Sequence, residues 1–255
     1  MTHEMLQTRQ GYGVPCLHDI RGGEDLVCVV AHGFGSSKES PTAQLLLQGL
    51  PARGIGAAAI DFPIHGESPD DAPPLRLAYC FDALAAAEAK ARALAPKARV
   101  VYFGSSFGAY TTLLYLAGRP HAGNRAFLRS AAVCMPELFH HRTEAEEAQL
   151  QALGYVVLGE DYGYARPLKL TRGFFDDLDS HDLFALWRPE EAALEMVHGE
   201  LDETIPLAEA RRFAGKFSVP LTVVPGGDHR LSLPGAPELV LERAAAFFLA
   251  EPRRL

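Results

Sequence analysis

The chain has no long hydrophobic run. None of its windows comes near the roughly eighteen uninterrupted apolar residues of a membrane-spanning helix. The first ten residues also lack a basic segment followed by an apolar run, which is the pattern of a secretory signal. We therefore expect a cytoplasmic protein that neither crosses nor binds a membrane.

Basic residues and cysteines are both scarce. There are 24 Lys and Arg residues against 32 Asp and Glu residues, so the formal net charge is −8. Nucleic acids and anionic membranes bind electropositive surfaces, so neither is an expected partner, although a local basic patch is not excluded. The cysteines (Cys16, Cys28, Cys80, Cys134) lie far apart and show no Cys-x-x-Cys or Cys/His metal spacing. We expect reduced, mostly buried thiols and no metal site.

Short apolar runs alternate with helical patterns along the chain. The runs lack period-two alternation, which is typical of parallel strands that are buried on both faces. Helices between them imply right-handed crossovers, so we predict one α/β domain with a mostly parallel, doubly wound sheet flanked by helices. The expected strands are residues 26–31, 55–60, 100–103, 131–135, 194–198 and 221–224.

Helices are expected between these strands, and a hairpin before them. Residues 7–13 and 14–20 form a candidate antiparallel hairpin at the edge of the sheet. The expected helices are one that begins at Ser40-Pro41 and four over residues 78–94, 107–117, 207–217 and 237–249.

The regular spacing stops between Pro136 and Pro189. This region holds a charged helical stretch (143–153), a hairpin pattern (155–164) and an acidic segment (176–182). Insertions of this size commonly cover the carboxyl ends of the strands, where α/β proteins bind ligands. We predict a core of residues 1–135 and 190–255 with a cap at 136–189; the alternative is a decoration packed elsewhere on the surface.

The segment Gly104-Ser105-Ser106-Phe107-Gly108 is the most informative motif. It reads G-x-S-x-G, follows an apolar strand and opens a helix, which is the context of a nucleophile elbow. A strand that turns sharply into a helix strains its middle residue, and only small neighbours allow the backbones to approach. We predict that Ser106 is a nucleophile exposed above the sheet.

A second loop, Ala31-His32-Gly33-Phe34-Gly35, ends another buried strand. Acyl transfer needs backbone N–H donors at the position of the developing oxyanion, each contributing about 3–4 kcal/mol. One donor is the residue after the nucleophile and the other comes from a loop like this one. We assign these donors to the amides of Phe107 and Phe34; an ordinary strand-ending turn is the alternative for the second loop.

A serine nucleophile requires a base and an acid that orients the base. Asp202 lies in a loop after an apolar strand, and His229 follows the last strand. The chain order is therefore Ser, Asp, His, which is the order found in hydrolases with a nucleophile elbow. We predict the triad Ser106, His229 and Asp202. Among the other histidines, His32, His65 and His198 are expected to have structural roles.

The acidic cluster between Asp176 and Asp182 is the rival for Asp202. Solvated carboxylates at a helix entry are the simpler interpretation, and a divalent-metal site is the sharper one. The cap aromatics are expected mostly to pack the cap onto the sheet. Tyr162 and Tyr164 are the candidate substrate-binding residues, because period-two spacing puts them on one face if this segment is a strand.

Together these motifs resemble the α/β-hydrolase superfamily over nearly the whole chain, with the fold, cap and triad described above. Within it the chain looks most like serine esterases of the cinnamoyl/feruloyl type and serine aminopeptidase-like hydrolases. Phe107 stands where such esterases often have a polar residue, which changes the wall of the pocket. The motifs are His32-Gly33-Phe34-Gly35, Asp61-Phe62 with His65-Gly66-Glu67-Ser68, residues 104–108, His198-Gly199 with Asp202 and Pro206, and Gly227-Asp228-His229.

The expected function is that of a serine hydrolase that cleaves small to medium carboxylic esters through an acyl-enzyme. Hydroxycinnamoyl (feruloyl-type) esters are one substrate class that the resemblance implies. The reaction needs no cofactor and no metal, and the expected partner is a small-molecule ester. An aminopeptidase or amidase, a thioesterase, a short-chain lipase and a non-catalytic binding protein on the same fold are the alternatives. The oligomeric state is not readable from the sequence.

Overall fold

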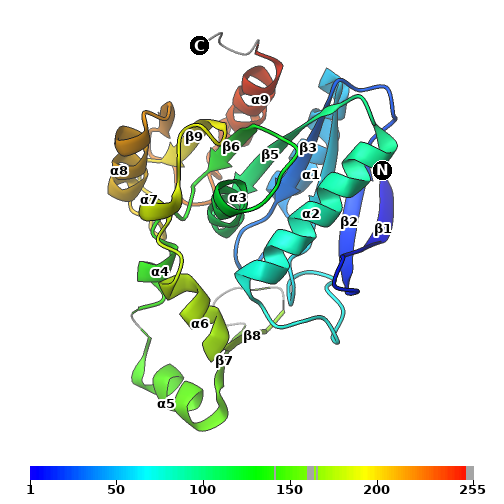
Figure 1. The fold of residues 1–255 in the computed structure, drawn as a ribbon. Coiled ribbons are helices and arrows are strands. Elements are labelled where there is room, and N and C mark those ends of the chain that lie inside the picture. The colour runs from blue at the N-terminus through cyan, green and yellow to red at the C-terminus, as the bar shows by residue number, and fades with distance from the viewer. Residues whose placement is uncertain (141, 160–163, 165, 251–255) are drawn as a thin grey trace.

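The computed structural model describes residues 1–140, 142–159, 164 and 166–250, and an eight-stranded sheet runs through its centre (Figure 1). The strand order is β1-β2-β4-β3-β5-β6-β9-β10; β2 is antiparallel to both neighbours and all later pairs are parallel. The predicted doubly wound α/β sheet is therefore confirmed. The strands of this sheet are β1 (Thr2–Gln7), β2 (Gly13–Asp19), β3 (Leu26–Ala31), β4 (Ile55–Ile60), β5 (Arg99–Ser105), β6 (Arg125–Arg129), β9 (Ala193–Gly199) and β10 (Leu221–Val224).

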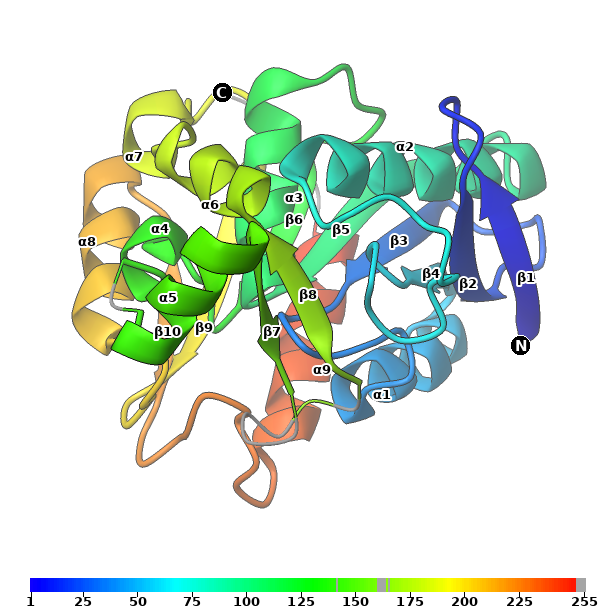
Figure 2. The same cartoon turned by 90° about the horizontal axis from the view of Figure 1, so that it is seen from below.

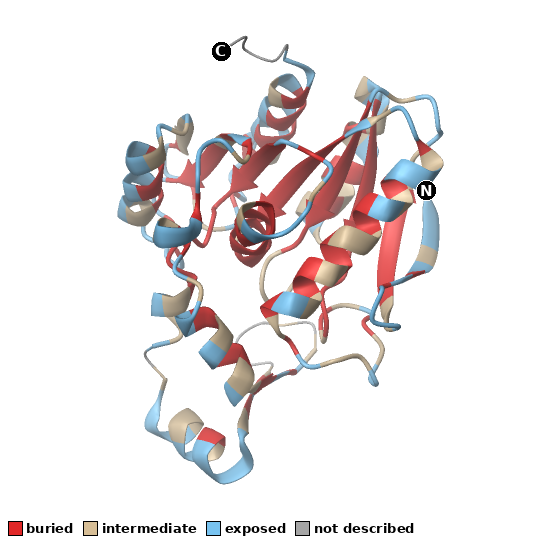
Figure 3. Ribbon diagram, in the orientation of Figure 1, coloured by how far each residue is buried: buried red, intermediate tan, exposed pale blue. Residues whose placement is uncertain are grey.

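Two layers of helices cover the sheet, because successive residues of its strands face opposite sides. Val27 and Val29 of β3 belong to the core layer that includes residues of α2, α3 and α8, whereas Cys28 and Val30 belong to the layer that includes residues of α1 and α9. The central strands are consequently buried on both faces (Figure 3). The helices before β6 and after β9 are α1 (Pro41–Gly49), the 3-10 turn η1 (Pro51–Arg53), α2 (Leu77–Leu94), α3 (Phe107–Gly118), α8 (Leu207–Phe217) and α9 (Ala236–Leu249).

One predicted strand was wrong. The strand after α3 is β6 (Arg125–Arg129), and residues 131–135 form turns that lead into a short helix. Arginines at both ends hid this strand from a search for apolar runs. Arg125 is buried nonetheless, because its Nη1 donates to the carbonyl oxygens of Phe247 and Ala250, each at 2.7 Å.

The edge hairpin is present, but its first strand begins earlier than predicted. Thr2 pairs with His18 and Gln7 with Gly13, so residues 8–12 form the turn. Inside this turn the amide of Tyr12 donates to Thr8 Oγ1 at 3.2 Å. Residues 7–13 therefore belong mostly to the turn and not to a strand.

Most of the chain between β6 and β9 lies below the sheet in Figure 1 and in front of it in Figure 2. A capping box between Thr143 and Glu146 starts helix α5 where the charged helical stretch was predicted. The predicted hairpin is longer than expected, because its second strand, β8, lies beyond residue 164. Buried and exposed residues alternate along the first three positions of this strand. The elements here are α4 (Met135–Leu138), α5 (Glu144–Leu153), β7 (Tyr155–Leu158), β8 (Leu168–Thr171), α6 (Arg172–Asp179) and α7 (Leu183–Leu186).

Within the described ranges, none of the helices combines the length and the apolarity that crossing a membrane requires.

Candidate active site

Ser106 lies in a strained turn between β5 and α3. Its backbone has φ 52° and ψ −115°, a region that non-glycine residues seldom adopt. Glycines on either side make the turn sterically feasible. A Cβ at Gly104 would lie 2.5 Å from Ala109 Cα, and one at Gly108 would overlap the carbonyl oxygen of Ala31. The two glycines of the motif thus permit the close packing that the elbow prediction required.

The three side chains predicted as a triad lie within hydrogen-bonding distance of one another. His229 Nε2 is 3.1 Å from Ser106 Oγ, and His229 Nδ1 is 2.9 Å from both carboxylate oxygens of Asp202. Because Nδ1 faces a carboxylate, it carries the proton, and the lone pair of Nε2 faces the serine hydroxyl. This arrangement can remove the hydroxyl proton of Ser106 as its oxygen attacks.

Asp202 is held by more than the catalytic histidine. Its side chain is fully buried, and its Oδ1 accepts hydrogen bonds from the amides of Thr204 (2.9 Å) and Ile205 (2.7 Å). His198 Nε2 lies 3.1 Å from Oδ2. Burial raises the pKa of Asp202, but the hydrogen bonds from His198, His229 and Ile205 outweigh it and hold the pKa well below its ordinary value. Asp202 is therefore ionised at neutral pH.

His198 is a site residue that sequence analysis left among the structural histidines. Its Nε2 also lies 2.9 Å from the carbonyl oxygen of Ile205, so both neighbours are acceptors and Nε2 is the protonated nitrogen. The side chain is fully buried at the end of β9. Its four-residue separation from Asp202 in a strand-end loop was the available signal, but such a spacing does not by itself distinguish contact with the acid from local packing.

The two amides predicted as oxyanion donors are free of protein acceptors. Within the described residues, neither Phe34 N–H nor Phe107 N–H donates a hydrogen bond to the protein. The Phe34 loop also approaches the nucleophile closely, since a Cβ at Gly33 would lie 3.3 Å from Ser106 Cβ. Both donors are available to a ligand beside Ser106, as that assignment requires.

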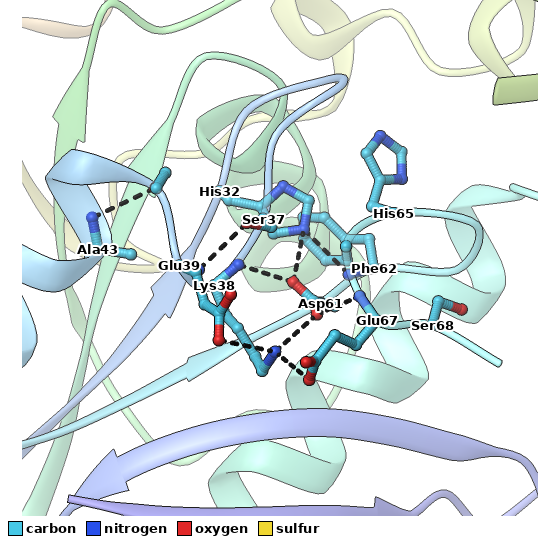
Figure 4. A network of polar contacts seen from close by, with 12 residues as sticks. His32, Ser37, Lys38, Glu39, Ala43, Asp61, Phe62, His65, Glu67 and Ser68 are labelled. Carbon is cyan, nitrogen blue, oxygen red and sulfur yellow. Dashed lines mark hydrogen bonds and ion pairs between the residues drawn. The ribbon is translucent and has the colours of Figure 1, made fainter. Parts of the chain in front are cut away.

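A buried ion network fixes the Phe34 loop, and sequence analysis did not identify it (Figure 4). Lys38 Nζ is fully buried and lies 3.2 Å from Asp61 Oδ2 and 2.7 Å from Glu67 Oε2. The backbone amide of Lys38 donates to Asp61 Oδ1 at 2.6 Å, and the amide of Phe62 donates to His32 Nε2 at 3.1 Å. These contacts join the loop after β3 to the loop after β4. A single lysine in a polar loop shows no sequence pattern of burial.

His32 and His65 have structural roles, as predicted. Burial lowers the pKa of His32 to about 4 and that of His65 to about 3. His65 Nδ1 contacts the carbonyl oxygen of Pro63 at 2.9 Å. Both rings are neutral at physiological pH. Their centroids lie 5.2 Å apart, and the ring of His65 lies 5.5 Å from that of Phe34.

A cavity of about 1290 Å³ opens above the three residues and is lined by both Ser106 and His229. The candidate residue Tyr164 also lines it, although Tyr164 lies outside the strands. Its ring covers Gly35 and lies 5.7 Å from the ring of Phe34. The other candidate, Tyr162, lies outside the described residues. Apolar side chains from the region between β6 and β9 complete the wall: Met135, Leu138, Phe139, Val156, Leu158 and Leu170.

One member of the acidic cluster that rivalled Asp202 joins this region to the rest of the molecule. Asp177 accepts from Arg76 Nε and Nη2, each at 2.7 Å, and from the amide of Leu77 at 3.0 Å. This bidentate pair fastens α6 to the start of α2. Asp179 pairs with the exposed His140 at 3.0 Å. The interpretation as solvated carboxylates at a helix entry holds only for Asp182, which caps α7 and accepts from the amide of Phe184 at 2.9 Å. It is wrong for Asp177 and Asp179, which lie in the last turn of α6 and form ion pairs.

Comparisons with known proteins agree with this fold. A family model described as alpha/beta hydrolase fold matches residues 27–159, which is more than half of the chain. No curated protein matches the sequence.

Three solved structures show the same fold at low sequence identity. Est1E from Butyrivibrio proteoclasticus with ferulic acid bound is 18% identical at a TM-score of 0.80, covering 96% of this chain and 98% of its own. Alpha/beta hydrolase domain-containing protein 10 from mouse is 16% identical at 0.73, covering 97% and 98%. The Pyrococcus furiosus esterase Pf2001 is 16% identical at 0.70, covering 97% and 91%.

Proposed function

The chain belongs to the α/β hydrolase family, and we propose that it is a serine esterase that cleaves carboxylic esters through an acyl-enzyme on Ser106. The observation that carries this proposal is the chain of contacts from Asp202 through His229 to Ser106, with distances of 2.9 and 3.1 Å. It occurs at the strand-to-helix turn where this family places its nucleophile.

In the first half of the reaction, Ser106 Oγ attacks the ester carbonyl while His229 Nε2 takes its proton. The ionised Asp202 stabilises the imidazolium that forms. The amides of Phe34 and Phe107 donate to the carbonyl oxygen as it becomes an oxyanion, and each such donor contributes about 3–4 kcal/mol to lowering the barrier. His229 then protonates the leaving alcohol, and the acyl group stays on Ser106.

In the second half, water repeats the attack on the acyl-enzyme. His229 removes a proton from this water, the same two amides hold the new oxyanion, and Ser106 leaves as the free hydroxyl. The carboxylic acid product then departs through the cavity.

The apolar wall of the cavity supports esters with an apolar acyl group. Phe139, Leu158 and Phe175 face this space from the region between β6 and β9. Est1E was solved with ferulic acid, and an aromatic acyl group of that kind matches such a wall. We therefore propose hydroxycinnamoyl esters as one substrate class, with Tyr164 at the edge of the acyl site.

A substrate panel with matched variants tests this function. The wild type is expected to hydrolyse 4-nitrophenyl esters and methyl hydroxycinnamates faster than thioesters or aminoacyl anilides. Ser106→Ala and His229→Asn should each lower kcat at least a thousandfold without changing the unfolding midpoint. Ser180→Ala, at an exposed serine after α6, is the matched control and should keep full activity. Ester turnover that survives in Ser106→Ala would refute the proposal.

A further inference from the structure

Two buried arginines stand at opposite ends of β6 on the same face of the sheet. Arg125 and Arg129 are 8% and 7% exposed. Phe127 lies between them and packs into the core beneath α1 and α9. Because side chains alternate along a strand, both arginine side chains leave the strand on the same face as Phe127. Their surroundings nevertheless differ.

Arg125 is compensated by the end of a helix. Its Nη1 contacts the carbonyl oxygens of Phe247, Phe248 and Ala250, where α9 ends. The carboxyl end of a helix carries partial negative charge, which stabilises a cation. The charge of Arg125 is therefore balanced within the fold.

Arg129 has less compensation. Its Nη1 donates to Ser105 Oγ and its Nη2 to the carbonyl oxygen of His229 at 3.2 Å. Across the ranges that the structure describes, no carboxylate lies within 4.0 Å of it. Burial lowers the pKa of Arg129 to about 10, while the charges of Asp202 and Asp228 raise it, so the group remains a cation at neutral pH.

The same guanidinium borders the candidate active-site cavity. Arg129 and Ser105 both line the space that Ser106 and His229 line. The same cavity is also lined by apolar side chains of this layer, including Val30, Phe103 and Leu231. The carboxylates of Asp202 and Asp228 act on Arg129 from more than 4.0 Å, so a buried cation here gains from an anion that joins it directly. A guanidinium matches a carboxylate in both charge and geometry.

We propose that this part of the cavity binds a carboxylate carried by the ester substrate, with Arg129 as its counter-ion and the hydroxyl of Ser105 as a second donor. The substrates would then be half-esters of dicarboxylic acids, or hydroxy acids that are acylated on the hydroxyl group and keep a free carboxylate. The statement about ester substrates rests on the proposed function, whereas carboxylate binding does not.

A calorimetric titration tests carboxylate binding without any turnover. Succinate is expected to bind the wild type at least tenfold more tightly than neutral succinamide. Arg129→Gln should remove this preference and Arg129→Lys should keep part of it. Arg125→Gln is the matched control: it removes a buried arginine from the same strand and should leave the preference intact. If Arg129→Gln does not fold, Ser105→Ala should weaken succinate binding severalfold while keeping the cation.

Hydrolysis of paired esters separates recognition from positioning, since Arg129 also holds the backbone of His229. Monomethyl succinate and dimethyl succinate test a carboxylate on the acyl side, and acetoxyacetate and its methyl ester test the alcohol side. The wild type is expected to prefer the anionic member of at least one pair in kcat/KM. Arg129→Gln should lower that preference at least tenfold, mainly through KM.

The outcomes distinguish this inference from the proposed function. Equal binding of succinate and succinamide to the wild type, or unchanged succinate binding in Arg129→Gln, would overturn the inference. So would a parallel loss of turnover on both members of each pair, because a purely positioning role predicts that result. Arg129-dependent succinate binding without ester hydrolysis would support the inference and refute the esterase proposal. Hydrolysis of neutral esters without succinate binding would do the reverse.

Discussion

The loops of the sheet and the segment between β6 and β9 border one cavity, but they are built differently. The loops hold their functional groups through short polar contacts to buried partners, such as Lys38 with Asp61 and His198 with Asp202. The inserted segment contributes an apolar wall and is fastened by a partly exposed ion pair, Arg76 with Asp177. Changes in the loops should therefore affect folding and turnover, whereas changes in the insertion should affect substrate affinity.

The sharpest contrast is between a glycine of the elbow and one at the end of α5. A Cβ at Gly108 would overlap backbone oxygens of Ala31 and His32, which cannot move aside. At Gly154, where φ is 75°, a Cβ would meet nothing within 4 Å. We expect Gly108→Ala to lower the free energy of unfolding by more than about 4 kcal/mol. Gly154→Ala should cost about 1 kcal/mol, from backbone strain alone.

Urea unfolding followed by circular dichroism measures both variants. Ser106→Ala serves as the control, because it truncates the elbow side chain without adding a clash. Equal costs for the two glycine variants would contradict the claim that close backbone packing distinguishes the elbow.

The second contrast between the loops and the segment between β6 and β9 concerns stability in acid. We expect the loops to dominate this pH dependence, because they contain the buried histidines His32 and His65. The pKa of His65 is about 3 and that of His32 about 4, against about 6.5 in the unfolded chain. Between these limits the unfolded state binds more protons, so stability falls as the pH is lowered through this window. Each histidine contributes a slope of up to about 1.4 kcal/mol per pH unit.

His65→Gln should make this pH dependence shallower by up to about 1.4 kcal/mol per pH unit between pH 6 and 4.5. Urea unfolding curves at several pH values give the slopes, and a constant m-value is the control for two-state unfolding. An unchanged slope would mean that His65 does not resist protonation in the folded state.

The smallest predicted effect concerns the anchor of the insertion. Arg76→Met removes the bidentate contact to Asp177, whose geometry fixes α6 beside α2. We expect KM for bulky aromatic esters to rise severalfold, because α6 is no longer held in place. The value of kcat for 4-nitrophenyl acetate should stay within about twofold, because a partly exposed ion pair contributes little to stability and its loss leaves the fold intact. Steady-state kinetics on both esters measures the split.

Arg53→Met is the matched control, since it removes a surface ion pair with Glu242 away from α6. A rise in KM that was equal in both variants, or a fall in kcat on the small ester, would contradict the division of roles between the two regions.

The same contrast explains what the sequence could predict. Strands β3 and β4 matched the predicted ranges residue for residue, because strands buried on both faces are continuous apolar runs bounded by turns. The three triad candidates followed from chain order and strand-end context, and the structure brings them together. These features depend on local pattern and on topology, both of which are written in the sequence.

The features that were missed depend on partners far away in the chain. The prediction for β6 was displaced along the chain because Arg125 is buried with its guanidinium bonded to carbonyl groups about 120 residues later. No local sequence pattern indicates such a partner. Lys38 is buried through Asp61 and Glu67 for the same reason. The second strand of the hairpin between β6 and β9 was misplaced because it begins only at Leu168, beyond the predicted end of the hairpin at residue 164.

The most direct measurement of the central claim is the mass of the protein after reaction with a fluorophosphonate, followed by peptide mapping. At neutral pH the account predicts one covalent adduct, on Ser106, that disappears in Ser106→Ala and forms far more slowly in His229→Asn. An unmodified protein, or an adduct on any other residue, would contradict the assignment of Ser106 as a nucleophile activated by His229.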